Sequence, residues 1–290
     1  MPPTAAETSR ARNLLLATDL GAHADRAEAR AVERARALGA RLHVVTVDET
    51  STIDTRRPRI APKSETLEGQ LRELYGKDLE VEAISESGEA WRIILREAVT
   101  RDCELVVLGP ADPTGLQEKL IGSTAERVMH AAPMPVLTVR RRARGPYTRV
   151  IAATDFSDCS KHALIAAASL LPEATFMVTH AYRVPYPGFL SEKGNEPDLR
   201  REAERDLADF MMSLGDEPSL SDRVSSQLRY GTLDEVFAQC ADEDETDLIV
   251  VGSHGSGGTF DKLLGGSAER LIGTLPCDVL VTRSPRASNI

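Results

Sequence analysis

The sequence has no long run of apolar residues. Its strongly apolar segments, such as Leu105–Leu108 and Leu248–Val251, fall far short of the roughly 18 residues that a membrane-spanning helix needs. The segment Met1–Arg12 also lacks the apolar centre of a secretory signal peptide. We therefore expect a soluble, cytoplasmic protein that does not act at a membrane.

Positive charge is in deficit. The chain has 35 Lys and Arg residues against 45 Asp and Glu residues, which gives a formal net charge of −10 at pH 7. Proteins that bind nucleic acids neutralise phosphates with basic surfaces. The charge balance therefore predicts no nucleic-acid partner.

Cysteine is scarce, and CxxC spacing is absent. Cys103, Cys159, Cys240 and Cys277 stand far apart in the sequence. Neither a zinc site nor a disulfide framework is indicated, and we expect four reduced thiols in the core.

Familiar phosphate motifs are missing as well. The sequence contains neither the GxxxxGK[ST] loop nor the GxGxxG dinucleotide fingerprint, so hydrolysis by those routes is not supported. His43 and His162 lack metal-ligand spacing, and no metal site is expected. His254 is the single candidate general base, and the alternative is that it only shapes a turn.

An internal repeat is present. An apolar run ending in Ala-Thr-Asp occurs at residues 13–20 and again at residues 150–156, with the two aspartates 136 positions apart. Near the other end of each unit, Leu105–Gly109 and Lys119–Arg127 recur 143 positions later as Leu248–Gly252 and Lys262–Arg270. Because 290 residues exceed the usual single-domain size of roughly 100–200, we predict two domains, residues 1–142 and 147–290. The basic segment Arg140–Pro146 is expected to be a solvated linker, or alternatively one whose arginines contact phosphates or an acidic surface.

Hydrophobic spacing predicts the α/β class. Short β-rich runs alternate with helical periodicity in each half, which is typical of a parallel sheet with helices on both faces. Gly39 is expected to end a helix over residues 24–38, and Ser157 to cap one that stops near Pro172. The remaining expected elements are strands at Leu42–Val47, Glu80–Ile84, Phe176–His180 and Ser225–Arg229, helices at Trp91–Val99 and Leu233–Ala241, and surface excursions at Thr50–Gln70 and Arg183–Pro197.

The most informative segment is glycine-rich. Residues 252–267 follow an apolar strand and precede a helix. Glycines let the backbone approach a ligand, and free amides at a helix start attract anions, so a di- or triphosphate would fit. Many strand-to-helix loops nevertheless carry glycine for purely steric reasons, and that alternative stays open.

The spacing resembles the ATP-binding signature of the universal stress protein family, G-x-x-G-(x9)-G-(S/T). Gly252, Gly255 and Gly265 match it, and the resemblance extends over both halves. It implies a Rossmann-like, adenine nucleotide α-hydrolase-like fold in each domain, an open parallel sheet of five strands. It also implies ATP, alone or with Mg²⁺, as the ligand.

The same resemblance implies roles for residues of the second half. Asp155 would accept a hydrogen bond from the adenine end, and Ala181 would lie against the base. Gly252 and Gly255 would frame the ribose and phosphates. Backbone amides at Gly265, Gly266 and Ser267 would bind the terminal phosphates. The family usually has Ser or Thr where Gly266 stands, which removes one hydroxyl contact, and Asp155 could alternatively be a helix cap.

The first half departs from the motif in its glycine loop. Asp112 stands where the second glycine belongs, Pro110 and Pro113 stiffen the turn, and a carboxylate there would repel a triphosphate. We therefore predict weak or no ATP binding in this half, although its equivalents Asp19, Val47, Gly109, Gly122 and Ser123 are present. Ser123 with Glu126 is alternatively a helix capping box.

The leading hypothesis is a tandem universal stress protein that binds ATP mainly in its second domain and acts in stress response or regulation without being an enzyme. The alternatives are a slow ATPase or nucleotidyl transferase, and a scaffold that binds no nucleotide. By resemblance, such domains dimerise through the edge strands Val136–Val139 and Asp278–Thr282. The tandem could satisfy that pairing internally as a pseudo-dimer, and a homodimer of chains stays open.

Overall fold

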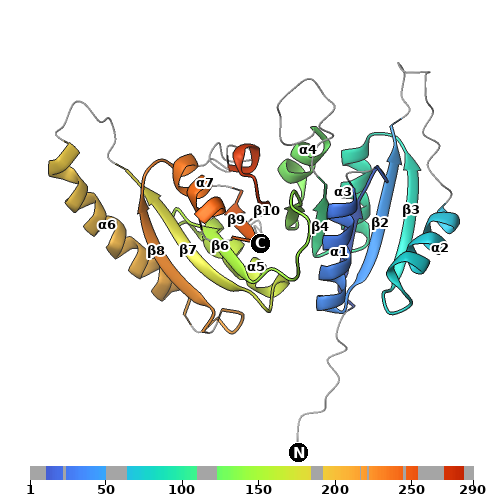
Figure 1. Cartoon of the computed structure of the whole chain (residues 1–290), viewed down its shortest axis with the longest axis horizontal. Helices are drawn as coiled ribbons and strands as arrows, with labels where there is room; N and C mark the ends of the chain where they lie inside the picture. The colour runs from blue at the N-terminus through green and yellow to red at the C-terminus, as the bar shows by residue number, and fades with distance from the viewer. Residues whose placement is uncertain are drawn as a thin grey trace, which may run out of the picture.

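Ten strands form one sheet across the part of the chain that the structure describes (Figure 1). The structure, a computed structural model, describes residues 11–21, 24–49, 64–109, 123–183, 192–215, 217–220, 222–243, 246–253 and 271–283. The strands are β1 (Asn13–Ala17), β2 (Arg41–Asp48), β3 (Val81–Ser87), β4 (Leu105–Leu108), β5 (Val136–Thr138), β6 (Arg149–Ala153), β7 (Thr175–Tyr182), β8 (Val224–Tyr230), β9 (Leu248–Gly252) and β10 (Asp278–Thr282). Their order is β3-β2-β1-β4-β5-β10-β9-β6-β7-β8, so each half contributes five adjacent strands. The predicted α/β fold class is confirmed.

The two halves meet at the centre of the sheet. Within each half all neighbouring strands run parallel, whereas β5 and β10 pair antiparallel, with Leu280 opposite Leu137. These are the two edge strands for which pairing within the tandem was one expected possibility. Each therefore covers the hydrogen-bonding edge that the other would expose.

Seven helices of the described residues cover both faces of the sheet. They are α1 (Asp25–Leu38), α2 (Ser64–Tyr75), α3 (Ala90–Thr100), α4 (Ser123–Ala131), α5 (Asp158–Leu170), α6 (Glu192–Ser213) and α7 (Leu233–Glu243). One face buries the apolar sides of α1, α2, α5 and α6. The other buries those of α3, α4 and α7 and the helical residues 271–274. This layering brings the two halves into one continuous core on each face.

The helix boundaries follow the predicted signals. Gly39 ends α1 in the left-handed conformation, with φ of 59°, and the Ser157 side chain caps α5 by accepting a hydrogen bond from the Ser160 amide. The expected surface excursions are only partly correct. Residues 64–70 belong to α2, and residues 192–197 belong to α6, which contains Pro197. The remainder of both segments lies outside the described residues, apart from Arg183.

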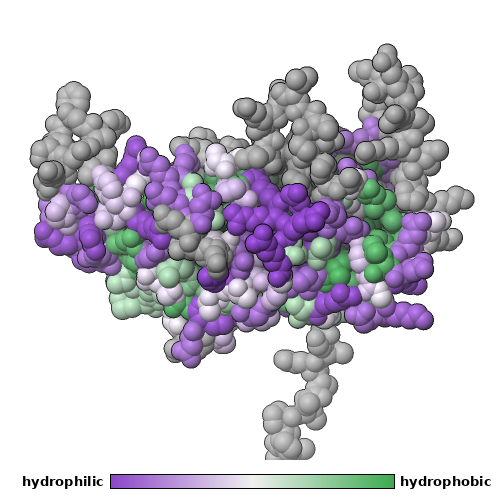
Figure 2. Space-filling view, viewed as in Figure 1, coloured by the Kyte–Doolittle hydropathy of each residue, from purple (hydrophilic) through white to green (hydrophobic). Residues whose placement is uncertain are grey.

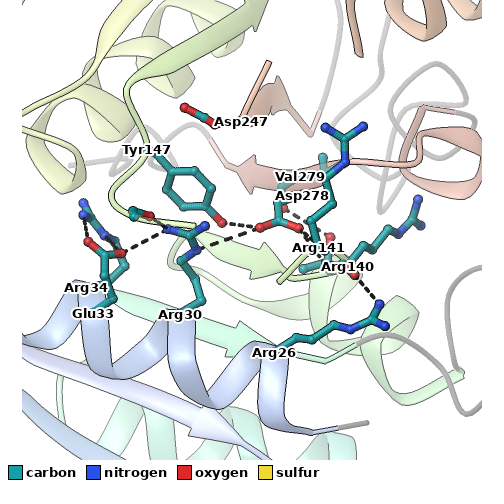
Figure 3. A network of polar contacts seen from close by, with 12 residues as sticks. Arg26, Arg30, Glu33, Arg34, Arg140, Arg141, Tyr147, Asp247, Asp278 and Val279 are labelled. Carbon is teal, nitrogen blue, oxygen red and sulfur yellow. Dashed lines mark hydrogen bonds and ion pairs between the residues drawn. The ribbon is translucent and has the colours of Figure 1, made fainter. Parts of the chain in front are cut away.

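The linker is not a uniformly solvated charge run, which corrects the sequence expectation. Arg142 and Arg144 are exposed, but Arg140 is buried and Arg141 half-buried. Asp278, at the start of β10, accepts hydrogen bonds from the Arg140 and Arg141 amides at 2.7 and 2.9 Å (Figure 3). Because these groups are paired with backbone and a buried carboxylate, the linker is part of the folded junction.

The described surface carries both hydrophilic and apolar side chains. Figure 2 shows hydrophilic side chains gathered over the middle of one face, where the halves meet. The large apolar side chains that are exposed are scattered over several elements: Leu20, Leu74, Val99, Met212 and Tyr230. None of the described helices is long and apolar enough to cross a membrane.

Candidate functional site

Three residues predicted to bind nucleotide lie at one edge of the sheet. Asp155 follows the end of β6, Gly252 ends β9, and Ala181 is the penultimate residue of β7. Since β6 pairs with both β7 and β9, its carboxyl end lies between theirs. The chain crosses from β8 to β9 on the opposite side of β6, which makes this a topological switch point, where open α/β sheets bind ligands.

A tight turn positions Asp155. The Thr154 amide donates to the carbonyl oxygen of Thr179 on β7 at 3.0 Å, and the Thr154 hydroxyl accepts from the Phe156 amide at 2.9 Å. Asp155 Oδ1 accepts from the amide and hydroxyl of Ser157 at 3.2 and 2.5 Å. The capping residue of α5 is thus Ser157, and Asp155 orients that cap.

The same turn is built in the first half. The Leu20 amide donates to the Thr18 hydroxyl at 3.0 Å, and Asp19 Oδ1 accepts from the Gly21 amide at 2.9 Å. Leu20 and its counterpart Phe156 both have positive φ, 55° and 66°. Left-handed backbone is costly for large side chains, and such strain is typically found where a particular geometry serves binding.

Sequence reasoning missed the two threonines of these turns. Thr18 and Thr154 are nearly buried and fix the backbone just before each aspartate. Their signal was present in the sequence, because the repeat preserves Thr as well as Asp in both copies of Ala-Thr-Asp.

Gly252 has a packing reason to be glycine. A Cβ atom there would lie 3.1 Å from both the carbonyl carbon and the Sγ of Cys159, in the first turn of α5. Its repeat equivalent Gly109 has more room, since a Cβ atom there would lie 3.7 Å from the Cβ of Ala27. The steric explanation therefore accounts for Gly252 without a ligand, and it does not account for Gly109.

Ala181 and Val47 occupy matching places on the second strand of each half. Both are partly buried and pack against the core on the face covered by α3, α4 and α7. On the other face, His180 stacks on Phe156 with ring centroids 4.2 Å apart, and its Nδ1 lies 2.8 Å from the carbonyl oxygen of Thr154. The strand end and the Asp155 turn are therefore fixed to each other.

The phosphate half of the motif lies outside the described residues. This applies to Gly255, Gly265, Gly266 and Ser267, to Gly122 and Asp112 in the first half, and to His254. Ser123 begins α4, which is consistent with a helix start at that motif. The roles assigned to these residues stay predictions.

The cysteines are structural thiols, as predicted. All four are free and buried. Burial raises the pKa of Cys103 and of Cys277 to about 12, so both stay protonated at neutral pH and are poor nucleophiles.

Histidines give no metal centre within the described part of the chain. His43 is buried on β2, with Nδ1 3.1 Å from Glu82 Oε2, and burial lowers its pKa despite that carboxylate. His162 is exposed on α5 and contacts the Asp158 carbonyl oxygen. No cluster of three or more potential ligands occurs among the described residues.

The family model for the universal stress protein family matches the chain twice, at residues 10–140 and 146–283. The chain belongs to the universal stress protein family. A universal stress protein of Thermus aquaticus is 31% identical over 141 residues, which is 47% of this chain and 99% of the relative. Universal stress protein A homolog 1 of Coxiella burnetii is 32% identical over 145 residues, 46% of this chain and 94% of the relative. These relatives are single copies of the unit that this universal stress protein carries in tandem.

Solved structures match the tandem arrangement. A putative universal stress protein from Pseudomonas aeruginosa has a TM-score of 0.68 at 20% identity, covering 95% of this chain and 94% of that one. A universal stress protein from Archaeoglobus fulgidus has a TM-score of 0.66 at 20% identity, with 93% and 96% covered. At these identities the likeness supports the fold of both halves.

Proposed function

We propose that this tandem universal stress protein binds ATP, alone or with Mg²⁺, at the carboxyl edge of β6, β7 and β9. In this proposal it acts in the cytoplasm as a nucleotide-dependent regulator of the stress response, not as an enzyme. The observation that carries the proposal is the convergence of Asp155, Ala181 and Gly252 on one switch point, directly before the glycine-rich segment of the sequence.

The proposed preference for the second half rests on the loops, since the turns are alike. Thr18-Asp19-Leu20 repeats the hydrogen bonds and positive φ of Thr154-Asp155-Phe156. The two halves differ in sequence after the fourth strand, where Asp112 replaces the second glycine. A carboxylate beside a triphosphate is unfavourable by the order of a kcal/mol even in water.

The first experiment is mass spectrometry of nucleotide released from the purified protein, with calorimetric ATP titration of wild type, Gly255→Asp and Gly122→Asp. We expect one ATP per chain, lost in Gly255→Asp and kept in Gly122→Asp. These two variants are a matched pair, because each adds one carboxylate to a motif glycine. Equal loss in both, or ATP bound to the first half alone, would contradict the proposal.

A scaffold without nucleotide is the second candidate, because packing against Cys159 already explains Gly252. It predicts no thermal shift with ATP, whereas a ligand at 100 times its dissociation constant stabilises by about 2.7 kcal/mol. If the wild type consumed ATP and His254→Ala did not, the protein would instead be a slow ATPase or nucleotidyl transferase.

A further inference from the structure

Two arginines occupy equivalent places after the last strand of each half. Arg140 follows β5 and Arg283 follows β10, and they stand 143 positions apart, the offset of the repeat. Because β5 and β10 pair antiparallel, the end of each strand lies beside the start of the other.

Each arginine contacts the last helix of the opposite half. The Arg140 guanidinium donates to the carbonyl oxygens of Ile272 and Leu275, at the end of the helical residues 271–274. The Arg283 guanidinium donates to the carbonyl oxygen of His130, one residue before α4 ends at Ala131. The contacts are thus reciprocal between the halves.

Such contacts are strong for two reasons. The last carbonyls of a helix have no partner within the helix, and a cation there interacts favourably with the helix dipole. Arg140 is only 8% exposed, and its own backbone is fixed, because its carbonyl accepts from Arg26 at 2.6 Å and its amide donates to Asp278 (Figure 3).

We propose that Arg140 and Arg283 are positioning residues, through which each half fixes the last helix of the other. In both halves that helix follows the motif segment at Gly122 or Gly265. Arg140 of the first half thereby supports nucleotide binding in the second half, a part of the proposal that rests on the proposed function.

Hydrogen exchange of the full chain tests the crossed contacts. The variants are Arg140→Met, Arg283→Met and Arg144→Met, the last a linker arginine that is exposed. We expect faster exchange at residues 271–277 in Arg140→Met and at α4 in Arg283→Met, with no change in Arg144→Met. Acceleration confined to the arginine's own half, or equal throughout the chain, would overturn the proposal.

ATP titration of the same variants tests the link to the site. Arg140→Met should weaken binding about tenfold, the usual size of such couplings, and Arg140→Lys should recover part of it. Arg144→Met should bind like wild type. Unchanged binding in Arg140→Met, despite faster exchange at residues 271–277, would overturn the positioning role. If the wild type itself binds no ATP, the proposed function fails, and the exchange experiment still decides the crossed contacts.

Discussion

At the scale of single residues, Gly252 and Gly109 separate packing from binding. They are equivalent in the repeat, yet an added Cβ would lie 3.1 Å from backbone and sulfur atoms of Cys159 at position 252 and 3.7 Å from Ala27 at position 109. We predict that Gly252→Ala destabilises the protein by about 1–3 kcal/mol through overpacking. Urea unfolding of the variant and the wild type measures this difference.

The matched control is Gly109→Ala, whose new methyl group makes only ordinary contacts. It should change the free energy of unfolding by less than about 1 kcal/mol. An equal loss of unfolding free energy in the two variants would mean that the close contact with Cys159 does not determine the cost at position 252.

Residues of the proposed site were predictable where the repeat, the glycine spacing and the family resemblance marked them. Asp155, Ala181 and Gly252 were singled out by the resemblance to the universal stress protein family, and they lie at the carboxyl ends of three neighbouring strands. The repeat marked Thr154 as a shared position, but its hydrogen bond from the Phe156 amide could not be predicted, because the sequence does not show which amide a threonine hydroxyl contacts. The close contact of Gly252 with Cys159 was also hidden, since it depends on how α5 approaches β9.

At the scale of elements, the cap of α5 links helix stability to the turn at Asp155. The Ser157 hydroxyl accepts from the Ser160 amide at 3.2 Å and donates to Asp155 Oδ1 at 2.5 Å. Ser157→Ala removes both bonds, and we predict a loss of about 1 kcal/mol in unfolding free energy. Ser157→Thr keeps the hydroxyl and should restore most of the stability in the same unfolding assay. If Ser157→Thr lost as much unfolding free energy as Ser157→Ala, the added methyl group and not the hydroxyl cap would determine stability at this position.

Element boundaries were predictable where local signals agree. Gly39 and Ser157 fixed helix ends because backbone conformation and capping are local properties. Helix α6 was not predicted, since Pro197 and the charged residues near its start favour a loop by composition. Its apolar positions, Ala203, Leu207 and Phe210, lie further along the chain and pack on the sheet, so tertiary burial decides that helix.

At the scale of the whole molecule, the junction depends on a buried charge cluster that the sequence could not reveal. Asp278 accepts from the Tyr147 hydroxyl at 2.6 Å, and its Oδ2 lies 4.0 Å from Arg30 Nε of α1 (Figure 3). The Arg30 guanidinium stacks 3.7 Å from the centre of the Tyr147 ring and donates to the Gly145 carbonyl. Residues from the first half, the linker and β10 therefore meet at one carboxylate, although they are more than a hundred positions apart in sequence.

The last prediction concerns cooperativity between the halves. Asp278→Ala leaves the Tyr147 hydroxyl and two backbone amides without their acceptor, whereas Arg30 keeps Glu33 at 3.2 Å. Each buried donor left without an acceptor typically costs about 1–3 kcal/mol. The single tryptophan, Trp91, reports on the first half by fluorescence, while circular dichroism reports on both halves. In the wild type we expect the two probes to give one coincident urea transition, and in Asp278→Ala we expect them to diverge.

Two control variants remove weaker interactions near the same junction. Tyr147→Phe removes one hydrogen bond and should cost about 1 kcal/mol, with the probes still coincident. Asp25→Asn breaks the exposed pair with Arg142, 3.6 Å apart, and should leave the transition where it is, because exposed pairs contribute little. Coincident transitions in Asp278→Ala would mean that the paired strands β5 and β10 are enough to unfold the halves as one unit. Diverging transitions would assign that coupling to the buried carboxylate, which belongs to the second half but is bound by the linker and by α1 of the first.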